Sequence, residues 1–328
     1  MKKSYMKAAV AISASAVLAL SACGRGEDSG NGGSGGSGNL DIALVSKGFQ
    51  HQFWQAVKAG AEEKAKELGV SMTFDGPASE TEVDAQLQML QSAIERQPDA
   101  IGYAALDPEA CVPLLDQAKQ ADIPVVEFDA GCNSKVPVTI CKTDSMAAGA
   151  LAADHMAELI GKKGKVAIVG HSQINSTGVE RRDGFVNKMK SDYPDIEIVD
   201  IQYGDGDHLK SADIAKAMIA AHSDLKGLYG TNEGSAIGIV DAVNELGLKP
   251  GKLTVVGFDS GKQQIDAIKS GVMAGAITQD PIGIGKCTIE SAVKAVNGDK
   301  QDEVQDTGSY WYDKTNVDAD DIKPKLYQ

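Results

Sequence analysis

The sequence predicts an α/β protein with two similar Rossmann-like lobes, each built on a parallel β-sheet with helices on both faces. Short β-branched runs alternate with longer segments in which apolar residues recur at helical spacing, a pattern typical of parallel sheets with right-handed crossovers. The chain has 328 residues, which exceeds the usual size of a domain with a single hydrophobic core and favours two domains. Only 5% of the residues are aromatic, as expected where small and β-branched residues pack helices closely on buried sheets.

The strand–helix cycle runs twice along the chain. In the first half, strands are predicted at residues 42–45, 70–74, 100–104 and 124–128, and helices at 53–68, 80–96 and 110–120. In the second half, the predicted strands are 165–169, 196–202, 227–229, 253–256 and 275–278. The helices of that half are 146–160, 180–191, 211–221, 235–246, 262–269 and 282–296.

The first residues have the layout of a secretory signal. Lys2, Lys3 and Lys7 give a basic start, and residues 8–20 form an apolar run too short for a permanent membrane span. Residues 20–23 resemble the lipobox of bacterial lipoproteins, which implies a signal at 1–22 and lipidation of Cys23. An ordinary signal peptide cut near Ala22 is the alternative. Residues 23–39 are rich in Gly, Ser and Asn, so they form a flexible linker. We expect a protein tethered by its lipid to the outer face of the cell membrane.

Charge and motif content exclude several classes of function. The formal net charge is −14, whereas nucleic-acid binding requires clustered Lys and Arg. No apolar stretch after the signal is long enough to cross a bilayer. The sequence contains no CxxC or HExxH pattern, so we expect no metal and no cofactor.

Four cysteines follow Cys23, and an even number in an exported protein permits disulfides. Cys132 and Cys141 flank the turn-like residues 133–137, which favours a bridge between them. A pairing of Cys111 with Cys287 is left open, because they are far apart in the sequence.

Polar side chains follow many of the predicted strands, where parallel sheets place their ligands. These residues include Asp107, Asp129, Asn232, Asp259 and Gln279. Carboxylates accept well from paired hydroxyls, and an amide both donates and accepts. Almost none of these residues is a nucleophile beside a base, which favours binding over catalysis. Asp107, which precedes a proline, is also suited to cap a helix.

His51, Phe53 and Trp54 stand together at the start of the first predicted helix. An aromatic face can cover the apolar C–H face of a sugar ring, although one or both rings could equally belong to the core. Arg181 and Arg182 are adjacent on a predicted helix, so they cannot both face the cleft.

An ordered set of motifs resembles the ribose/galactose-type periplasmic sugar-binding proteins, which have the type I periplasmic-binding fold. The matching residues are 42–46, 53–54, 123–126, 181–185, 232–233, 255–259 and 278–281. The resemblance implies two lobes, 40–143 with 279–307 and 144–278 with 308–328, joined by three crossings in the hinge.

The same resemblance assigns roles to the site residues. Phe53 and Trp54 would sandwich a sugar ring, while Asp129, Asn232, Asp259 and Gln279 would bind its hydroxyls and Asp107 would lie in the ligand loop. This chain departs from the family pattern at Ala130 and Val179, where arginines are common. The departures leave two alternatives: Arg181 binds the ligand in the cleft, or Arg181 is structural and Arg182, His51 or Lys47 makes the cationic contact.

These observations predict a monomeric, lipid-anchored protein that binds a monosaccharide for an ABC permease and its ATPase. Fructose, ribose, xylose and galactose are candidate cargoes. The alternative is a receptor that passes a sugar-like signal to a membrane sensor. A glycosidase or isomerase would need a carboxylate pair or a metal in the cleft.

Overall fold

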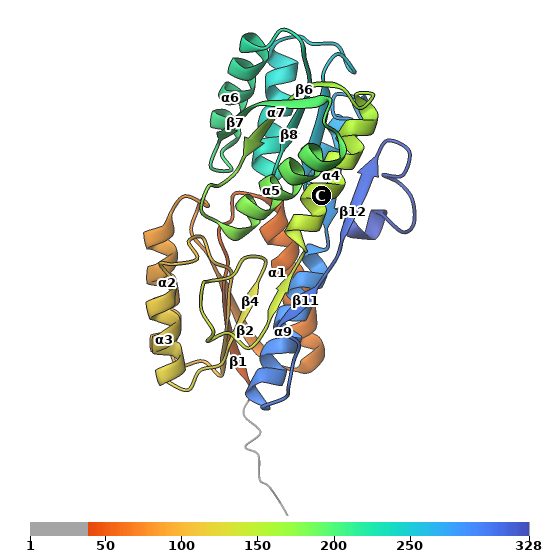
Figure 1. Cartoon of the computed structure of the whole chain (residues 1–328). Coiled ribbons are helices and arrows are strands. Elements are labelled where there is room, and N and C mark those ends of the chain that lie inside the picture. The colour runs from red at the N-terminus through yellow and green to blue at the C-terminus, as the bar shows by residue number, and fades with distance from the viewer. Residues whose placement is uncertain (1–38, 328) are drawn as a thin grey trace, which may run out of the picture. The chain divides into compact units, whose positions relative to one another are not determined.

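Two six-stranded sheets carry the fold, one in each lobe (Figure 1). The computed structural model describes residues 39–327. The predicted signal at 1–22, the lipidation site Cys23 and linker residues 24–38 lie outside the described residues. Within residues 39–327, none of the helices is both long and apolar enough to span a membrane.

The sheet of the first lobe has the strand order β11-β5-β4-β3-β1-β2, and its neighbouring strands are all parallel. The strands are β1 (Asp41–Val45), β2 (Ser71–Asp75), β3 (Ala100–Tyr103), β4 (Val125–Phe128), β5 (Ile140–Lys142) and β11 (Val304–Asp306). Helices α1 (Gln52–Leu68) and α9 (Pro281–Val296) cover one face, and α2 (Val83–Glu95) and α3 (Val112–Gln120) cover the other.

Alternation along β1 divides the first lobe into two cores. Ile42 and Leu44 pack with α1 and α9, whereas Ala43 and Val45 pack with α2 and α3, because successive side chains of a strand point to opposite faces. Helices α1 and α9 approach closely at Gly285, where an added Cβ would lie 2.0 Å from the carbonyl oxygen of Val57. A glycine is required there, because any larger residue would force α1 and α9 apart.

The sheet of the second lobe has the order β12-β10-β9-β8-β6-β7, in which only β12 runs antiparallel to its neighbour β10. The strands are β6 (Gly164–Gly170), β7 (Ile196–Tyr203), β8 (Leu225–Gly230), β9 (Thr254–Phe258), β10 (Gly275–Gln279) and β12 (Ser309–Asp313). Helices α4 (Ser145–Leu159) and α5 (Ser176–Asp192) pack on one face. Helices α6 (His208–Ala221), α7 (Glu233–Glu245) and α8 (Lys262–Ser270) pack on the other, and a 3₁₀ turn covers Lys323–Lys325.

The chain crosses between the two sheets three times. The crossings join β5 to α4, β10 to α9 and β11 to β12. Two of them are tied together, because the hydroxyl of Thr143 donates to the carbonyl oxygen of Gly308 at 3.1 Å. The predicted fold class, two parallel-sheet lobes joined by a three-stranded hinge, is confirmed.

The sequence pattern did not indicate strands β5, β11 and β12. β5 and β11 have three residues each, which is too short for a periodic signal, and β12 follows the last strong helix pattern. Helix α5 begins at Ser176 rather than at residue 180, because the side chain of Asn175 caps it by accepting from the amide of Thr177.

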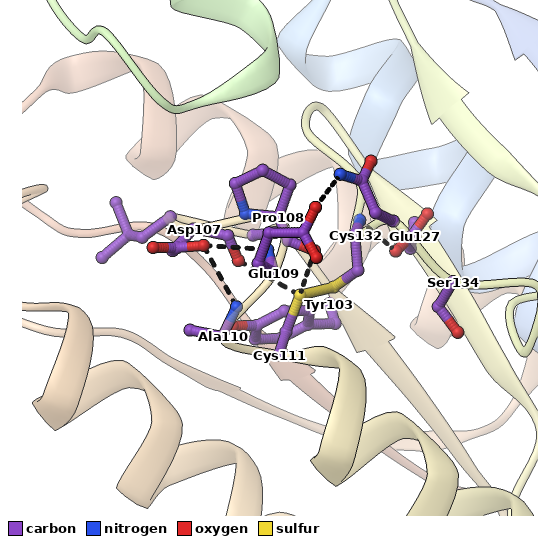
Figure 2. Close-up of a disulfide and its surroundings, with 12 residues drawn as sticks. Tyr103, Asp107, Pro108, Glu109, Ala110, Cys111, Glu127, Cys132 and Ser134 are labelled. Carbon is purple, nitrogen blue, oxygen red and sulfur yellow. Dashed lines mark hydrogen bonds between the residues drawn. A yellow bond between two sulfur atoms is a disulfide. The ribbon is translucent and has the colours of Figure 1, made fainter.

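The predicted disulfide between Cys132 and Cys141 is wrong. Cys132 pairs with Cys111, as Figure 2 shows, and Cys141 pairs with Cys287, so the open pairing of Cys111 with Cys287 does not occur either. The two faces of the first sheet explain this result. Cys141 lies in the core beneath α9, whereas Cys132 packs on the opposite core beside α3. Each cysteine is bridged to the helical layer on its own face of the sheet.

Candidate functional site

Polar side chains from both lobes meet at the carboxyl ends of the two sheets. They surround a cavity of about 10 Å³, which has room for about one water molecule. The cavity is lined by Lys47, His51, Phe53, Trp54, Glu80, Asp129, His171, Arg181, Asn232, Asp259 and Gln279. We call this the cleft cavity. It brings together every predicted binding residue except Asp107 and Arg182.

Aromatic side chains form one wall of the cleft cavity. Phe53 and Trp54 are the second and third residues of α1, and both are almost completely buried. Their rings touch edge to face, with centroids 4.9 Å apart and planes at 86°. Two perpendicular rings in contact leave no slot between them, so the predicted sandwich of a sugar ring by Phe53 and Trp54 is wrong. Each ring can instead offer a face or an edge to a ligand.

Glu80 fixes this wall from the loop after β2. Its Oε1 accepts from the indole Nε1 of Trp54 at 2.8 Å and lies 3.2 Å from Nδ1 of His51. Burial raises the pKa of the Glu80 carboxyl, but the charges of Lys47 and His51 more than offset this and hold it well below its usual range. Glu80 is therefore a charged, buried anchor for two residues that line the cavity.

His51 joins the two lobes. Its Nε2 lies 3.0 Å from the carbonyl oxygen of Gly206, in the second lobe, and its Nδ1 faces Glu80. Burial lowers the pKa of His51, but Glu80 and Glu233 outweigh burial and raise it to about 9. Each ring nitrogen lies near an acceptor, so the geometry fits an imidazolium that donates on both sides. The side-chain amide of Gln50, whose Nε2 lies 3.1 Å from Nε2 of His51, donates to the same carbonyl oxygen of Gly206 at 3.3 Å.

Two cations cross the cleft beside the carboxylate of Asp129. Lys47, which follows β1, holds its Nζ 2.8 Å from Oδ2 of Asp129 and 3.3 Å from the hydroxyl of Thr177 in the second lobe. The guanidinium of Arg181 lies 4.0 Å from Asp129 and 4.0 Å from Asp259, between the carboxylates of opposite lobes. It also stacks on the ring of Phe258 at 3.8 Å.

Asp129 and Asp259 occupy matching positions in the two lobes. Each directly follows a buried strand, and their φ angles of +59° and +77° lie in the left-handed region that side-chain-bearing residues seldom adopt. Such backbone strain persists where the surroundings fix it, often at functional sites. Asp259 accepts from Nε2 of Gln279 at 2.7 Å and from the amide of Glu233 at 2.9 Å.

Burial shifts the pKa values of two further groups in the cleft cavity. It raises the pKa of Asp259, and the nearby Arg181 and Gln279 oppose the rise. It lowers the pKa of His171 well below the usual value, and the charges of Arg181 and Lys47 lower it further. His171 is therefore neutral at pH 7.

Two predicted residues lie elsewhere. Oδ1 of Asp107 accepts from the amides of Glu109 and Ala110 and caps the turn before α3, as Figure 2 shows. Arg182 bonds to Asp183 at 2.7 Å and to the hydroxyl of Tyr203 at 2.8 Å. Of the two adjacent arginines between which the sequence did not choose, it is Arg181 that lines the cleft cavity.

The sequence does not single out Glu80, because residues 80–96 match a helical pattern that places Glu80 in the first turn of a helix. The helix begins at Val83, which leaves Glu80 in the loop after β2. The feature that points to Glu80 is its place after a predicted strand, because ligands of parallel sheets collect beyond the carboxyl ends of the strands. His171 follows β6 in the same way.

The fold and the site define a two-lobed binding protein with a closed polar cleft. Residues 42–300 match the family model described as a periplasmic binding protein domain. The D-allose-binding periplasmic protein of Escherichia coli is 30% identical over 271 residues, which cover 79% of this chain and 86% of that protein. The ribose import binding protein of Bacillus subtilis is 26% identical and covers 79% and 82% of the two chains.

Similar solved structures are also of sugar-binding proteins. An ABC transporter solute-binding protein from Agrobacterium vitis, with bound D-fucose, has a TM-score of 0.84 and 32% identity, and the match covers 88% of this chain and 100% of that one. A carbohydrate transporter solute-binding protein from Agrobacterium radiobacter, in complex with D-arabinose, has a TM-score of 0.85 and 29% identity, with coverage of 88% and 99%. This chain belongs to the periplasmic binding protein domain family, which agrees with the predicted resemblance and with a role in binding rather than catalysis.

Proposed function

We propose that this protein binds one monosaccharide, a pentose or a hexose, outside the cytoplasm and delivers it to the permease and ATPase of an ABC importer. The named relatives support the ligand class, since they bind or carry allose, ribose, fucose and arabinose. The cleft cavity supports it independently, because polar groups and aromatic rings converge there from both lobes.

One observation carries the proposal. Nε of Arg181 and Oε1 of Gln279 are buried and have no hydrogen-bond partner within residues 39–327. Both side chains line the cleft cavity. One of these groups donates and the other accepts, which is what a hydroxyl group matches. A polyhydroxylated ligand would satisfy both groups and offset the cost of burying them.

The charges of the cleft cavity favour an uncharged sugar. Each cation already faces a carboxylate: Lys47 faces Asp129, His51 faces Glu80, and Arg181 lies between Asp129 and Asp259. A sugar phosphate or a sugar acid would bring a charge without a free counter-ion, at a substantial desolvation cost.

Capture requires the lobes to separate. The cavity of about 10 Å³ is far too small for a sugar ring in the conformation described. We infer that the sugar enters an open form and that contacts with both lobes shift the population toward the closed form.

Membrane attachment and the lobe boundaries complete the proposal. Residues 1–22 would be cleaved as a signal, Cys23 would carry the lipid, and residues 23–39 would tether a monomeric body to the outer face of the cell membrane. The lobes would comprise 40–143 with 280–307 and 144–279 with 308–328. Gln279 is assigned to the second lobe because it pairs with Ser309 in that sheet.

A thermal-shift screen tests the ligand class. The protein is heated with ribose, fructose, xylose, arabinose, galactose, glucose and allose, each in separate samples. A ligand that binds only the folded state raises Tm by mass action, and at a hundred times its Kd it stabilises by about 2.7 kcal/mol. A clear rise with one or two sugars supports the proposal. An unchanged Tm with all seven sugars at millimolar concentration contradicts it.

A further inference from the structure

The N-terminus of α1 and the N-terminus of α8 face each other across the cleft, and neither has a capping side chain at its own N-cap residue. The N-cap of α1 is His51 and that of α8 is Gly261, and within the described residues neither makes a side-chain cap. The first four amides of a helix need acceptors from outside the helix. In both helices, part of this need is met by the opposite lobe.

Glu233 of the second lobe caps α1 of the first. Its Oε1 accepts from the amide of Gln52 at 3.0 Å, and its Oε2 accepts from the amide of Phe53 at 3.2 Å. A carboxylate at a helix N-terminus also interacts favourably with the helix dipole. Glu233 is only 3% exposed, so closure removes its carboxylate from water and the two amides replace its hydration.

Gln52 of the first lobe returns the contact. Its Oε1 accepts from the amide of Lys262, the first residue of α8, at 2.7 Å. The backbone amide of Gln52 therefore donates to the second lobe, and the side-chain oxygen of Gln52 accepts from the second lobe. The hydrogen bonds of Glu233 to α1 and of Gln52 to α8 can form only when the lobes are together, since α1 packs on the first sheet and α7 and α8 pack on the second.

This exchange is connected to the residues that line the cleft cavity. The amide of Glu233 donates to Oδ2 of Asp259, and the amide that Glu233 caps belongs to Phe53. Asp259 and Phe53 both line the cavity, one from each lobe. A ligand that contacts both Asp259 and Phe53 would hold Glu233 close to the start of α1.

We propose that Glu233 and Gln52 are positioning residues that form a reciprocal cross-lobe cap, in which each lobe completes the N-terminus of a helix in the other when the protein closes on its sugar. The proposal rests on the proposed function for its ligand, but the cap itself is a property of the closed chain. Glu233 does not need to touch the sugar. It stabilises closure, and closure retains the sugar.

Amide hydrogen exchange of the protein, with and without the sugar that gives the largest thermal shift, tests this cap. In Glu233→Gln, one acceptor oxygen and the charge are lost, so the amides of Gln52 and Phe53 should exchange faster than in the wild type. In Gln52→Ala, the amide of Lys262 should exchange faster.

Sugar affinity is the second measurement. It should fall about fivefold to tenfold in Glu233→Gln, which is the effect expected when a charged side chain that caps a helix is lost, and it should fall less in Gln52→Ala. Glu245→Gln is the matched control, because Glu245 is an exposed residue on the same helix that pairs with Lys216 of its own lobe.

Failure of the cross-lobe cap and failure of the proposed function give different results. Unchanged exchange at Gln52 and Phe53 in Glu233→Gln, or faster exchange with unchanged sugar affinity, overturns the cross-lobe cap. If Glu233→Gln does not fold, Gln52→Ala decides the question through the Lys262 amide and the affinity. A wild-type protein that binds none of the sugars overturns the proposed function instead. The cap is then tested on the fraction of the protein that closes without sugar: slower exchange of the Gln52 and Phe53 amides in the wild type than in Glu233→Gln supports it, and equal exchange overturns it.

Discussion

The indole Nε1 of Trp54 donates a hydrogen bond of 2.8 Å to Oε1 of Glu80, and this bond fixes the aromatic wall of the cleft cavity. Glu80 holds its negative charge because Lys47 and His51 surround it. The same oxygen faces the imidazole of His51, which reaches the second lobe at Gly206. One carboxylate thus sets the orientation of a ring that lines the site and the charge of a residue that bridges the lobes.

Replacement of Glu80 should weaken both relationships. In Glu80→Gln the amide can still accept from Trp54, but the charge that faces His51 is lost. We expect the pKa of His51 to fall from about 9 toward its ordinary value, and the free energy of unfolding to fall by about 1–3 kcal/mol. An NMR titration of His51 and a urea denaturation series measure the two effects. Glu62→Gln on the exposed face of α1 is the control and should change stability by less than about 0.5 kcal/mol. An unchanged His51 titration would contradict this role of Glu80.

Asp259 is the residue on which ligand binding should depend most. Its removal in Asp259→Ala leaves the amide of Glu233 and the side chain of Gln279 without their acceptor, and takes a carboxylate from the sugar. We expect sugar affinity in a calorimetric titration to fall by at least about a hundredfold. Asp266→Ala, an exposed aspartate on α8, should bind as the wild type does. Wild-type affinity in Asp259→Ala would remove Asp259 from the site.

His51 should make stability depend on pH in a defined window. Its pKa is raised from 6.5 to about 9 in the folded protein, so its charged form contributes stability that is fully present below pH 6.5. That contribution is lost as the pH rises through 9, by roughly 1.4 kcal/mol for each pKa unit. The pKa values of His155, His171 and His208 are lowered, so these residues titrate below this window.

Denaturation curves between pH 6 and 9.5 check this dependence. The free energy of unfolding of the wild type should decline across the range, and His51→Gln should show a flatter profile. Equal slopes in the two proteins would show that His51 is not the group responsible.

The two disulfides should differ in their effect on stability. Cys141 and Cys287 are 146 residues apart in sequence, and Cys111 and Cys132 are 21 apart. Because a longer closed loop loses more entropy in the unfolded chain, removal of the Cys141–Cys287 bridge should cost about 1.7 kcal/mol more. Guanidinium denaturation of the two double alanine variants measures this difference. A larger loss for the Cys111–Cys132 pair would contradict the loop-entropy explanation.

Lipid attachment predicts a change of cell fraction. In Cys23→Ala, the protein should move from the membrane fraction to the soluble extracytoplasmic fraction, because its only proposed anchor is gone. Immunoblotting of fractionated cells measures this shift, with Cys111→Ala as a control that keeps the proposed lipidation site. Retention of Cys23→Ala in the membrane fraction would refute lipid anchoring through this residue.

The fold and most of the residues that line the cleft cavity could be predicted from the sequence, because both follow from local patterns. A buried run followed by Asp129 or Asp259 marks a strand end, and parallel strand ends share one edge of a sheet. Helical periodicity located α1, and with it the cluster of His51, Phe53 and Trp54.

Other features depend on geometry that the sequence does not carry locally. The choice between Arg181 and Arg182 is a rotation of about 100° around α5, and it depends on where that helix begins. The pairing of Cys141 depends on which face of β5 its side chain occupies, and β5 is too short to show a period. Glu80 depends on the path of a loop, and the capping of α1 by Glu233 joins residues that are 180 or more positions apart.

Small-angle X-ray scattering tests whether a monosaccharide holds the two lobes together. Scattering curves are recorded for the wild-type protein without sugar and with the sugar that gives the largest thermal shift. We expect a smaller radius of gyration at saturating sugar, with a concentration dependence that matches the calorimetric affinity. A sugar that binds with no change in the radius of gyration would contradict capture by lobe closure.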